Sequence, residues 1–408
     1  MSFKKILILM MSFLLLGIPS LVHIFGLGYS SIYIALISCI ILIILLSHNY
    51  NNNIGNITLD LKLNNVIETI FYTIFCFIIV FQGLKENDYL SEKFVFTVIN
   101  ILVIFLVMKM ARTTITLYFS FFLLTLYFVS IIYVFIFLYE TASSGSLTYI
   151  MQSYRLTLFD NPIFTSRIMG FIIVLAIFYI FIIKKFRIVN SMIFIISLLI
   201  LGSSGSRQTI IALLLSVLFL LFYNNKSILL NGKIKKRNIY KVVIFLFTFP
   251  VFFLIIVNFF RKLFSNLYIF QRLSSQGLDS TGRIEIYNQT INIIMSDVGN
   301  FLFGIGYNNF QDYSLFAYPH NLILEIWVEL GFLFLLLFLI YLISTIVLFI
   351  KNRSFIDSNN FAIVLTLFIY FFSLSMFSSA LYGNNMVFVF LIIMNLLSAG
   401  YKRNNLCI

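Results

Sequence analysis

Long apolar stretches separated by short polar segments dominate the chain. Stretches of about 17–25 mostly apolar residues are long enough to cross the hydrocarbon core of a membrane as α-helices. By this criterion we predict twelve spanning helices, near residues 6–25, 29–47, 66–84, 94–111, 115–139, 167–183, 188–203, 208–223, 242–258, 322–350, 361–379 and 385–400. Lys4 and Lys5 precede the first stretch as in a signal peptide, but the stretch is too long and no small-residue cleavage site follows it.

The composition agrees with this pattern. Hydrophobic residues make up 61% of the 408 residues, charged residues 10%, and the mean hydropathy is +1.05. Soluble globular domains carry about 25% charged residues. The chain is therefore predicted to be an all-α polytopic membrane protein, and the composition excludes a soluble enzyme or a DNA-binding protein.

The positive charges predict the orientation of the twelve spans. Of the 27 Lys and Arg residues, 18 fall in one set of alternate loops, which includes both ends of the chain. Because cytoplasmic loops carry an excess of Lys and Arg, we expect both termini to be cytoplasmic. The basic stretch Lys226–Lys241 then reads as a topology signal rather than as a site for anionic lipid headgroups.

Two predicted outer loops are longer than turns, at about Glu140–Ser166 and Phe259–His320. We expect three parts: N-terminal helices over residues 1–258, an extracytoplasmic loop with short amphipathic helices over 259–320, and C-terminal helices over 321–408. The three cysteines predict neither a disulfide nor a metal site, since they do not cluster with each other or with histidine.

Several arginines lie on the side that the topology rule disfavours. Arg207 sits in the small-residue turn Gly202–Gln208, where a guanidinium can bind two phosphate oxygens. Arg261 and Arg272 lie in the long outer loop. Arg261 follows a span so directly that headgroup anchoring is the favoured explanation for it, with substrate binding as the alternative. Cations at an outer membrane face suit an anionic substrate such as a lipid pyrophosphate.

Arg283 lies where a helix is predicted to begin. Ser280 and Thr281 precede a helical repeat of apolar residues formed by Ile284, Tyr287, Ile291 and Met295. A cation in the first turn opposes the helix dipole unless an anion binds there. The alternative is a salt bridge from Arg283 to Asp279 or Glu285.

The segment Pro319–Gly331 carries the densest group of candidate residues. Asn321 is expected to cap the helix that follows it, which leaves His320 beside the positive end of the helix dipole and neutral at pH 7. A neutral imidazole can accept a proton from a sugar hydroxyl. Glu325 and Glu329 share one helix face and are candidates to pair with an arginine or to bind substrate.

Taken together, these motifs resemble the O-antigen polymerase/ligase superfamily. The resemblance rests on the Ser-x-Ser-Arg turn at Ser204–Arg207, Arg283 near a helix start, the Gly-x-Gly turn at Gly304–Gly306, and Pro-His-Asn with Glu-x-Gly at Pro319–Gly331. It covers about residues 200–335, and the N-terminal half matches in hydropathy alone.

The resemblance implies a GT-C-like membrane glycosyltransferase in a bacterial cytoplasmic (inner) membrane. Such proteins take a glycan from undecaprenyl pyrophosphate without a nucleotide sugar, a metal ion or another cofactor, for lipopolysaccharide or capsule. The catalytic roles would fall on His320, Arg283 and Arg207, with substrate contacts at Glu325, Glu329, Asn321, Arg261 and Arg272. Partners would be the lipid-linked oligosaccharide, membrane lipids and a chain-length regulator, and no nucleic acid.

Three functions remain open on the sequence. A polymerase extends the glycan on the next lipid-linked repeat unit, whereas a ligase transfers it to lipid A–core or to a protein. A flippase for lipid-linked sugars is the least favoured, because ionisable residues are scarce inside the first nine predicted spans. We expect the polymerase by analogy with the family.

Overall fold

The computed structural model describes residues 3–12, 15–16, 63–86, 101, 104–143, 162–204, 206–224, 282–377 and 381–400. The predicted spans at 29–47 and 242–258 lie outside these residues, as do Arg261 and Arg272. The chain divides into two compact units. Unit 1 comprises residues 1–129, 280–364 and 371–408, and unit 2 comprises residues 130–279 and 365–370.

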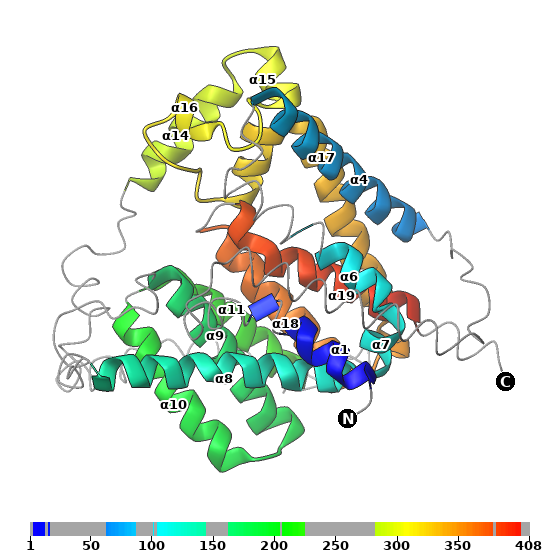
Figure 1. Ribbon diagram of the computed structural model, residues 1–408, viewed down its shortest axis with the longest axis vertical. Coiled ribbons are helices and arrows are strands. Elements are labelled where there is room, and N and C mark those ends of the chain that lie inside the picture. The colour runs from blue at the N-terminus through cyan, green and yellow to red at the C-terminus, as the bar shows by residue number, and fades with distance from the viewer. Residues whose placement is uncertain are drawn as a thin grey trace, which may run out of the picture. The chain divides into compact units, whose positions relative to one another are not determined.

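Unit 1 is built around α17 (Leu322–Lys351), which packs against α4 (Leu63–Glu86) and α19 (Asn385–Gly400). The helices α14 (Arg283–Ile294), α15 (Val298–Phe303) and α16 (Phe310–Tyr313) precede α17, and α14 and α15 contact it (Figure 1). The unit also holds α1 (Phe3–Ser12), α6 (Ile104–Met110), α7 (Arg112–Leu117), the start of α8 (Phe119–Ser143), most of α18 (Ser358–Ser375) and the short turns η5 (Arg353–Phe355) and η6 (Leu381–Asn384).

Unit 2 is built around α9 (Pro162–Phe178), which continues into the π-helical turn η4 (Tyr179–Ile183). The helices α10 (Arg187–Ser204) and α11 (Arg207–Asn224) pack against α9. Gly170 permits a close approach within this unit, because a Cβ atom there would fall on the hydroxyl of Tyr370. That hydroxyl donates a hydrogen bond of 2.9 Å to the carbonyl oxygen of Arg167.

The predicted helical membrane architecture is supported where the structure describes the chain. Five of the described helices are long and apolar enough to cross a membrane: Phe119–Tyr139, Pro162–Ile183, Arg187–Ser204, Leu322–Lys351 and Ser358–Ser375. Shorter apolar helices lie at Val66–Phe75, Arg207–Tyr223 and Asn385–Ser398. Each coincides with a predicted span, and the described ranges contain no strand. The count of twelve remains a prediction.

A buried polar cluster joins four helices of unit 1. The carboxylate of Glu68 on α4 pairs with Lys109 on α6 and accepts hydrogen bonds from Tyr341 on α17 and Asn395 on α19. Glu68 is fully buried, and the side chain of Lys109 is 24% exposed. The helix α6 extends through Lys109 and directs it to a carboxylate 41 residues earlier.

Removal of one partner of this ion pair should destabilise unit 1. Glu68→Leu leaves the Lys109 ammonium without its counter-charge, which is expected to lower the free energy of unfolding by about 3 kcal/mol. The double variant Glu68→Leu/Lys109→Leu removes both charges and should regain most of that loss. Thermal unfolding of the purified protein in detergent compares the two, and a double variant as unstable as Glu68→Leu would contradict the prediction.

Candidate functional site

The helix α17 is broken near its N-terminal end by Gly331, whose φ of 85° and ψ of 169° are not helical. The break deprives the preceding turn of its usual amide donors. Two backbone amides of the Gly-x-Gly turn replace them: Ile305 donates to the carbonyl oxygen of Val328 at 2.8 Å, and Gly306 donates to that of Glu329 at 3.1 Å. The Gly-x-Gly turn therefore completes the hydrogen bonding of a kinked helix.

Two glycines allow the backbone of the Gly304–Gly306 turn to pack directly against the backbone of α17 at its kink, a contact called the crossing below. A Cβ atom on Gly331 would fall on the carbonyl oxygen of Leu302, and one on Gly304 would fall on the carbonyl oxygen of Glu329. Both glycines also have positive φ values, 85° and 76°, which residues with a side chain rarely adopt. The Glu-x-Gly motif of the sequence thus marks a backbone crossing, for which only glycine fits at Gly331.

A small hydrophobic core joins the loop helices to the first part of α17. It consists of Ile286 and Ile294 of α14, Phe310 of α16 and Val328 of α17. The predicted start of α14 is confirmed, because the helix begins at Arg283 with Gly282 as its N-cap. Its packing face was not foreseen.

The apolar stripe that predicted α14 lies largely on its exposed face. The exposed fractions of Ile284, Ile291 and Met295 are 67%, 43% and 58%. The face that packs carries Ile286 and Ile294 instead, with the buried Thr290 between them at a spacing of one helical turn from each. The hydroxyl of Thr290 donates a hydrogen bond to the carbonyl oxygen of Ile286 in the same helix. The hydroxyl can be buried there because this bond satisfies it.

Asn321 caps the first turn of α17 as expected. Its Oδ1 atom accepts hydrogen bonds from the backbone amides of Ile323 and Leu324 at 3.0 and 3.1 Å. Its Nδ2 atom donates to the carbonyl oxygen of Met376 at the end of α18, at 3.3 Å. This one side chain therefore fixes both the helix start and the neighbouring α18–α19 turn.

His320, immediately before the cap, has a strained backbone. Its φ is 59°, in the left-handed region that costs roughly 1–2 kcal/mol for a residue with a side chain. Its ring lies 4.2 Å from the ring of Tyr318, centroid to centroid, at an interplanar angle of 54°. A strained backbone persists only where the surrounding structure enforces it, and such residues are common at functional sites.

The half-buried position of His320 and the nearby Arg283 both disfavour the imidazolium form. Burial first, and the positive charge of Arg283 second, lower the pKa of His320 below its ordinary value of 6.5. The expected neutral state at pH 7 is thus supported, with causes that differ from the helix dipole invoked from the sequence. The packing of α14 on α17 brings these two candidate catalytic residues together.

Glu325 and Glu329 are both buried on the first segment of α17, with exposed fractions of 3% and 4%. The Oε1 atom of Glu325 accepts a hydrogen bond of 2.7 Å from the backbone amide of Leu381 in η6. The sequence did not single out this α18–α19 turn, since its polar residues follow an apolar run without a recognisable motif. The α18–α19 turn thus contacts residues 282–331, called the site segment below, at both Asn321 and Glu325.

A further candidate, Arg207, belongs to unit 2. Arg207 begins α11 in unit 2, where the hydroxyl of Ser206 lies 3.0 Å from that of Thr209, which donates to Ser166 at 3.0 Å. In unit 1, the indole nitrogen of Trp327 donates to the carbonyl oxygen of Phe301 at 3.3 Å, and its ring packs edge-on against the Phe301 ring.

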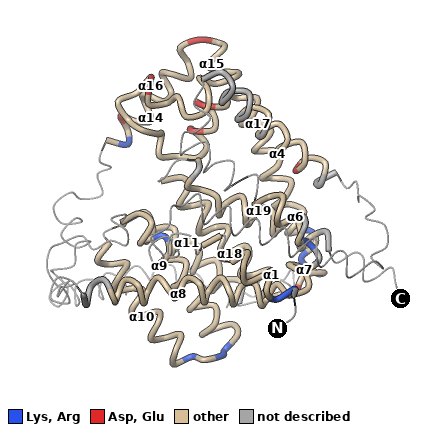
Figure 2. The backbone as a smooth tube through the Cα atoms, viewed as in Figure 1, with Lys and Arg blue, Asp and Glu red and all other residues tan. Residues whose placement is uncertain are grey.

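Acidic residues predominate in the site segment of unit 1, whereas basic residues gather on α1, α6 and α7 (Figure 2). Residues 282–331 contain five carboxylates and one Lys or Arg, namely Arg283. In the described ranges, no three His, Cys, Asp or Glu side chains come together as metal ligands would. Arg283 is therefore the cation that this segment itself can offer to an anionic ligand.

A family comparison agrees with the motifs of this segment. Residues 192–339 match the family model described as O-antigen ligase. This segment belongs to the O-antigen polymerase/ligase superfamily. The O-antigen ligase match includes all eight candidate site residues of the sequence analysis and the whole kinked crossing. No curated protein matches the chain.

The crossing should tolerate no side chain at Gly331. Gly331→Ala meets both an unfavourable φ and the Leu302 carbonyl, so we expect it to lower the free energy of unfolding by at least about 3 kcal/mol. Gly282→Ala is the matched control, because Gly282 has a φ of 67° and nothing within 4 Å of its Cβ position. It should cost only about 1–2 kcal/mol. Thermal unfolding in detergent measures both, and equal losses would argue against the close crossing.

Proposed function

We propose that the chain is a polysaccharide repeat-unit polymerase of the outer face of the bacterial cytoplasmic membrane. It transfers a growing glycan from undecaprenyl pyrophosphate to a sugar hydroxyl of the next lipid-linked repeat unit. The observation that carries this proposal is a strained, half-buried His320, held neutral beside Arg283 at a capped helix start. The family match over residues 192–339 supports the class of reaction.

In the proposed reaction, His320 acts as the general base. It takes the proton of the acceptor hydroxyl while the oxygen attacks the anomeric carbon of the donor sugar. The new glycosidic bond forms as the bond from that carbon to the pyrophosphate breaks, and the pyrophosphate leaves with the electron pair. Arg283 stabilises the negative charge that develops on the leaving group.

One guanidinium offsets only part of the charge of a pyrophosphate. Arg207, Arg261 and Arg272, which the sequence predicts for an anionic substrate, are kept in the proposal as further candidate ligands of the pyrophosphate. Glu325 and Glu329 are assigned to sugar hydroxyls, and Asn321 holds His320 in place through the helix cap. No step in this scheme requires a metal ion or a nucleotide sugar.

A ligase is the second candidate, because the matching family is described as O-antigen ligase. The donor chemistry is the same in both functions, and the acceptor alone differs. We favour the polymerase by analogy within the superfamily, whose polymerases diverge widely in sequence. The experiment below separates the two.

Deletion of the gene in its host should collapse the ladder of surface polysaccharide to a single repeat unit on its normal anchor. The wild-type gene should restore the ladder, whereas His320→Asn should not, with at least about a hundredfold lower chain extension. Asn tolerates a positive φ, so this variant removes the base without adding backbone strain. Polyacrylamide gels of the polysaccharide provide the measurement, and immunoblots of membranes control for insertion.

Three outcomes of that gel are informative. Long lipid-linked chains that accumulate without their anchor would identify a ligase instead. A ladder that does not change on deletion would exclude both enzyme functions. Normal chain lengths with His320→Asn would remove His320 from the mechanism.

The pH dependence should report the charge of Arg283. Activity requires neutral His320, so it should fall as the pH decreases through the pKa of His320, which lies below 6.5. Arg283→Gln removes the positive charge that lowers this pKa. The fall in activity at acidic pH, called the acidic limb, should therefore move to higher pH. Arg283→Lys keeps the charge and should leave the limb in place. The shift is measured from the transfer rates of the purified protein between about pH 4.5 and 8, an interval that includes the usual pKa values of histidine.

The position of the limb is independent of how much activity each variant retains. Arg283→Gln is also expected to be slower at every pH, because it loses stabilisation of the leaving group. An acidic limb at the same pH in Arg283→Gln and the wild type would contradict the proposed contact between the two charges.

A further inference from the structure

The turn that joins η4 to α10 in unit 2 is basic and exposed. Lys184, Lys185 and Phe186 form it, and α10 begins at Arg187. These four residues, called the basic turn below, are all exposed, and Figure 2 shows the positive charge where α10 begins. The helices on either side, Pro162–Ile183 and Arg187–Ser204, are both long and apolar enough to cross a membrane. The basic turn therefore lies at a membrane surface, where two spans end.

The backbone of the basic turn is held in a fixed shape. Lys184 and Phe186 have φ values of 60° and 50°, in the left-handed region that residues with a side chain rarely adopt. The buried side chain of Asn190 fixes this shape, because its Nδ2 atom donates to the carbonyl oxygens of Lys185 and Phe186 at 3.0 and 3.1 Å. The cations and the aromatic ring are thus presented from a rigid backbone.

The positive charge of the basic turn is not balanced by neighbouring carboxylates. Residues 161–278 contain fourteen Lys or Arg residues and no Asp or Glu. In the part of the chain that the structure describes, no carboxylate forms an ion pair with Lys184, Lys185 or Arg187. The three cations repel one another and also oppose the positive end of the α10 dipole, since the first turn of α10 holds no acidic residue. An anion from outside the chain would relieve this repulsion.

Exposed apolar side chains next to the cations favour a lipid over a soluble anion. Phe186, Ile188 and Val189 are 79%, 74% and 54% exposed. A free phosphate would pair with the cations and leave these three side chains in water. A phospholipid suits both kinds of side chain, because its phosphate is attached to a glycerol and to acyl chains.

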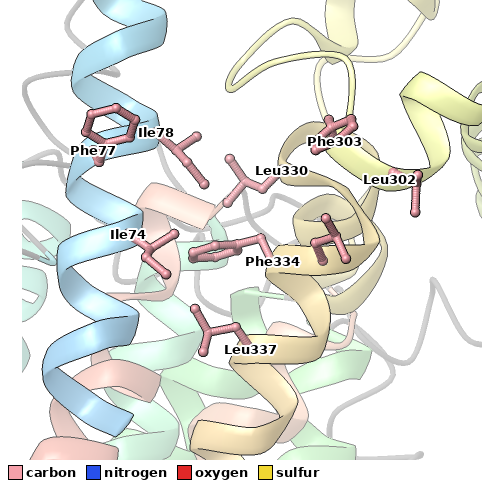
Figure 3. Close-up of a pocket in the computed structure, with 9 residues that line it drawn as sticks. Ile74, Phe77, Ile78, Leu302, Phe303, Leu330, Phe334 and Leu337 are labelled. Atoms are coloured by element: carbon pink, nitrogen blue, oxygen red, sulfur yellow. The ribbon is translucent and has the colours of Figure 1, made fainter. Parts of the chain in front are cut away.

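An apolar groove beside the kink of α17 in unit 1 lacks this combination of groups. Its wall consists of Ile, Leu and Phe side chains of α4, α15 and α17, which Figure 3 shows. Such a wall gains from any apolar contact and carries no charge with which to distinguish one lipid from another. The basic turn, in contrast, can select a lipid by its headgroup.

We propose that the basic turn binds the headgroup of an anionic phospholipid in the leaflet where it lies. This lipid site goes beyond the proposed transfer reaction and does not depend on it. The topology rule explains why cations gather in the loops on one side of a membrane. It requires only their charge, on any backbone. The fixed left-handed turn and the exposed Phe186 between the cations are what indicate a headgroup site.

The full-length protein should bind phosphatidylglycerol at this turn. Native mass spectrometry of the protein in detergent, titrated with phosphatidylglycerol or with phosphatidylcholine, measures the affinity for each lipid. We expect at least about tenfold tighter binding of phosphatidylglycerol. Lys184→Gln/Lys185→Gln keeps the length of both side chains and removes their charges, and should weaken the binding of phosphatidylglycerol about tenfold. Phe186→Asn keeps the charges and tolerates the positive φ, and should weaken it too.

A second basic turn provides the matched control. Lys351→Gln/Arg353→Gln removes two exposed cations between α17 and α18, which are also long enough to span a membrane. No residue of that turn has a positive φ, and Asp357 follows it with a negative charge. This variant should bind phosphatidylglycerol as tightly as the wild type does. Thermal unfolding in detergent checks that every variant is folded.

Each contrary result would overturn the lipid site. Equal losses in the two double variants would reduce the binding to general attraction between cations and anionic lipids. Competition by glycerol 3-phosphate, which has the phosphate without acyl chains, would identify a site for a soluble anion instead. Unchanged binding in Phe186→Asn would remove the apolar contact from the site. Because the readout is lipid binding, none of these results bears on the proposed polymerase, which the polysaccharide ladder tests separately.

Discussion

Two backbone hydrogen bonds, from Ile305 to Val328 and from Gly306 to Glu329, fix the geometry of the site segment. A helix that breaks inside an apolar environment leaves carbonyl groups without donors, and each would cost free energy if it stayed unpaired. The loop supplies the donors, and the absence of side chains at Gly304 and Gly331 lets it approach closely enough. The same approach brings α14 onto α17, so the position of Arg283 relative to His320 follows from how a broken helix is capped.

Hydropathy and capping rules predicted much of this arrangement. The apolar runs gave helices close to their expected positions, and Asn321 and Arg283 lie at helix starts as their neighbours indicated. The kink was not predicted, because a single glycine in a long apolar run changes the hydropathy very little. The pairing of Lys109 with Glu68 was not predicted either, since the two residues lie 41 positions apart and share no local motif.

The electrostatics of the segment favour a base over an acid. His320 lies in a stretch with five carboxylates and one Lys or Arg. Burial and the charge of Arg283 lower its pKa. Arg283 thus has two compatible tasks in the proposed reaction: it adds to the effect of burial in keeping the imidazole neutral before transfer, and it attracts the leaving anion during transfer. The order of the helices, with α14 packed on the first part of α17, makes both tasks available to one side chain.

The kink at Gly331 also sets the thickness of membrane that α17 can match. Taken as one straight helix, its 30 residues would rise roughly 45 Å, well beyond the roughly 30 Å of a hydrocarbon core. The break leaves Phe332–Lys351 as the straight portion, which rises roughly 30 Å. The first portion, with its two glutamates, is then released from the requirement to face lipid. A break in the helix thus lets a protein keep carboxylates close to a bilayer, because the portion of the helix that bears them does not continue the straight membrane-spanning portion.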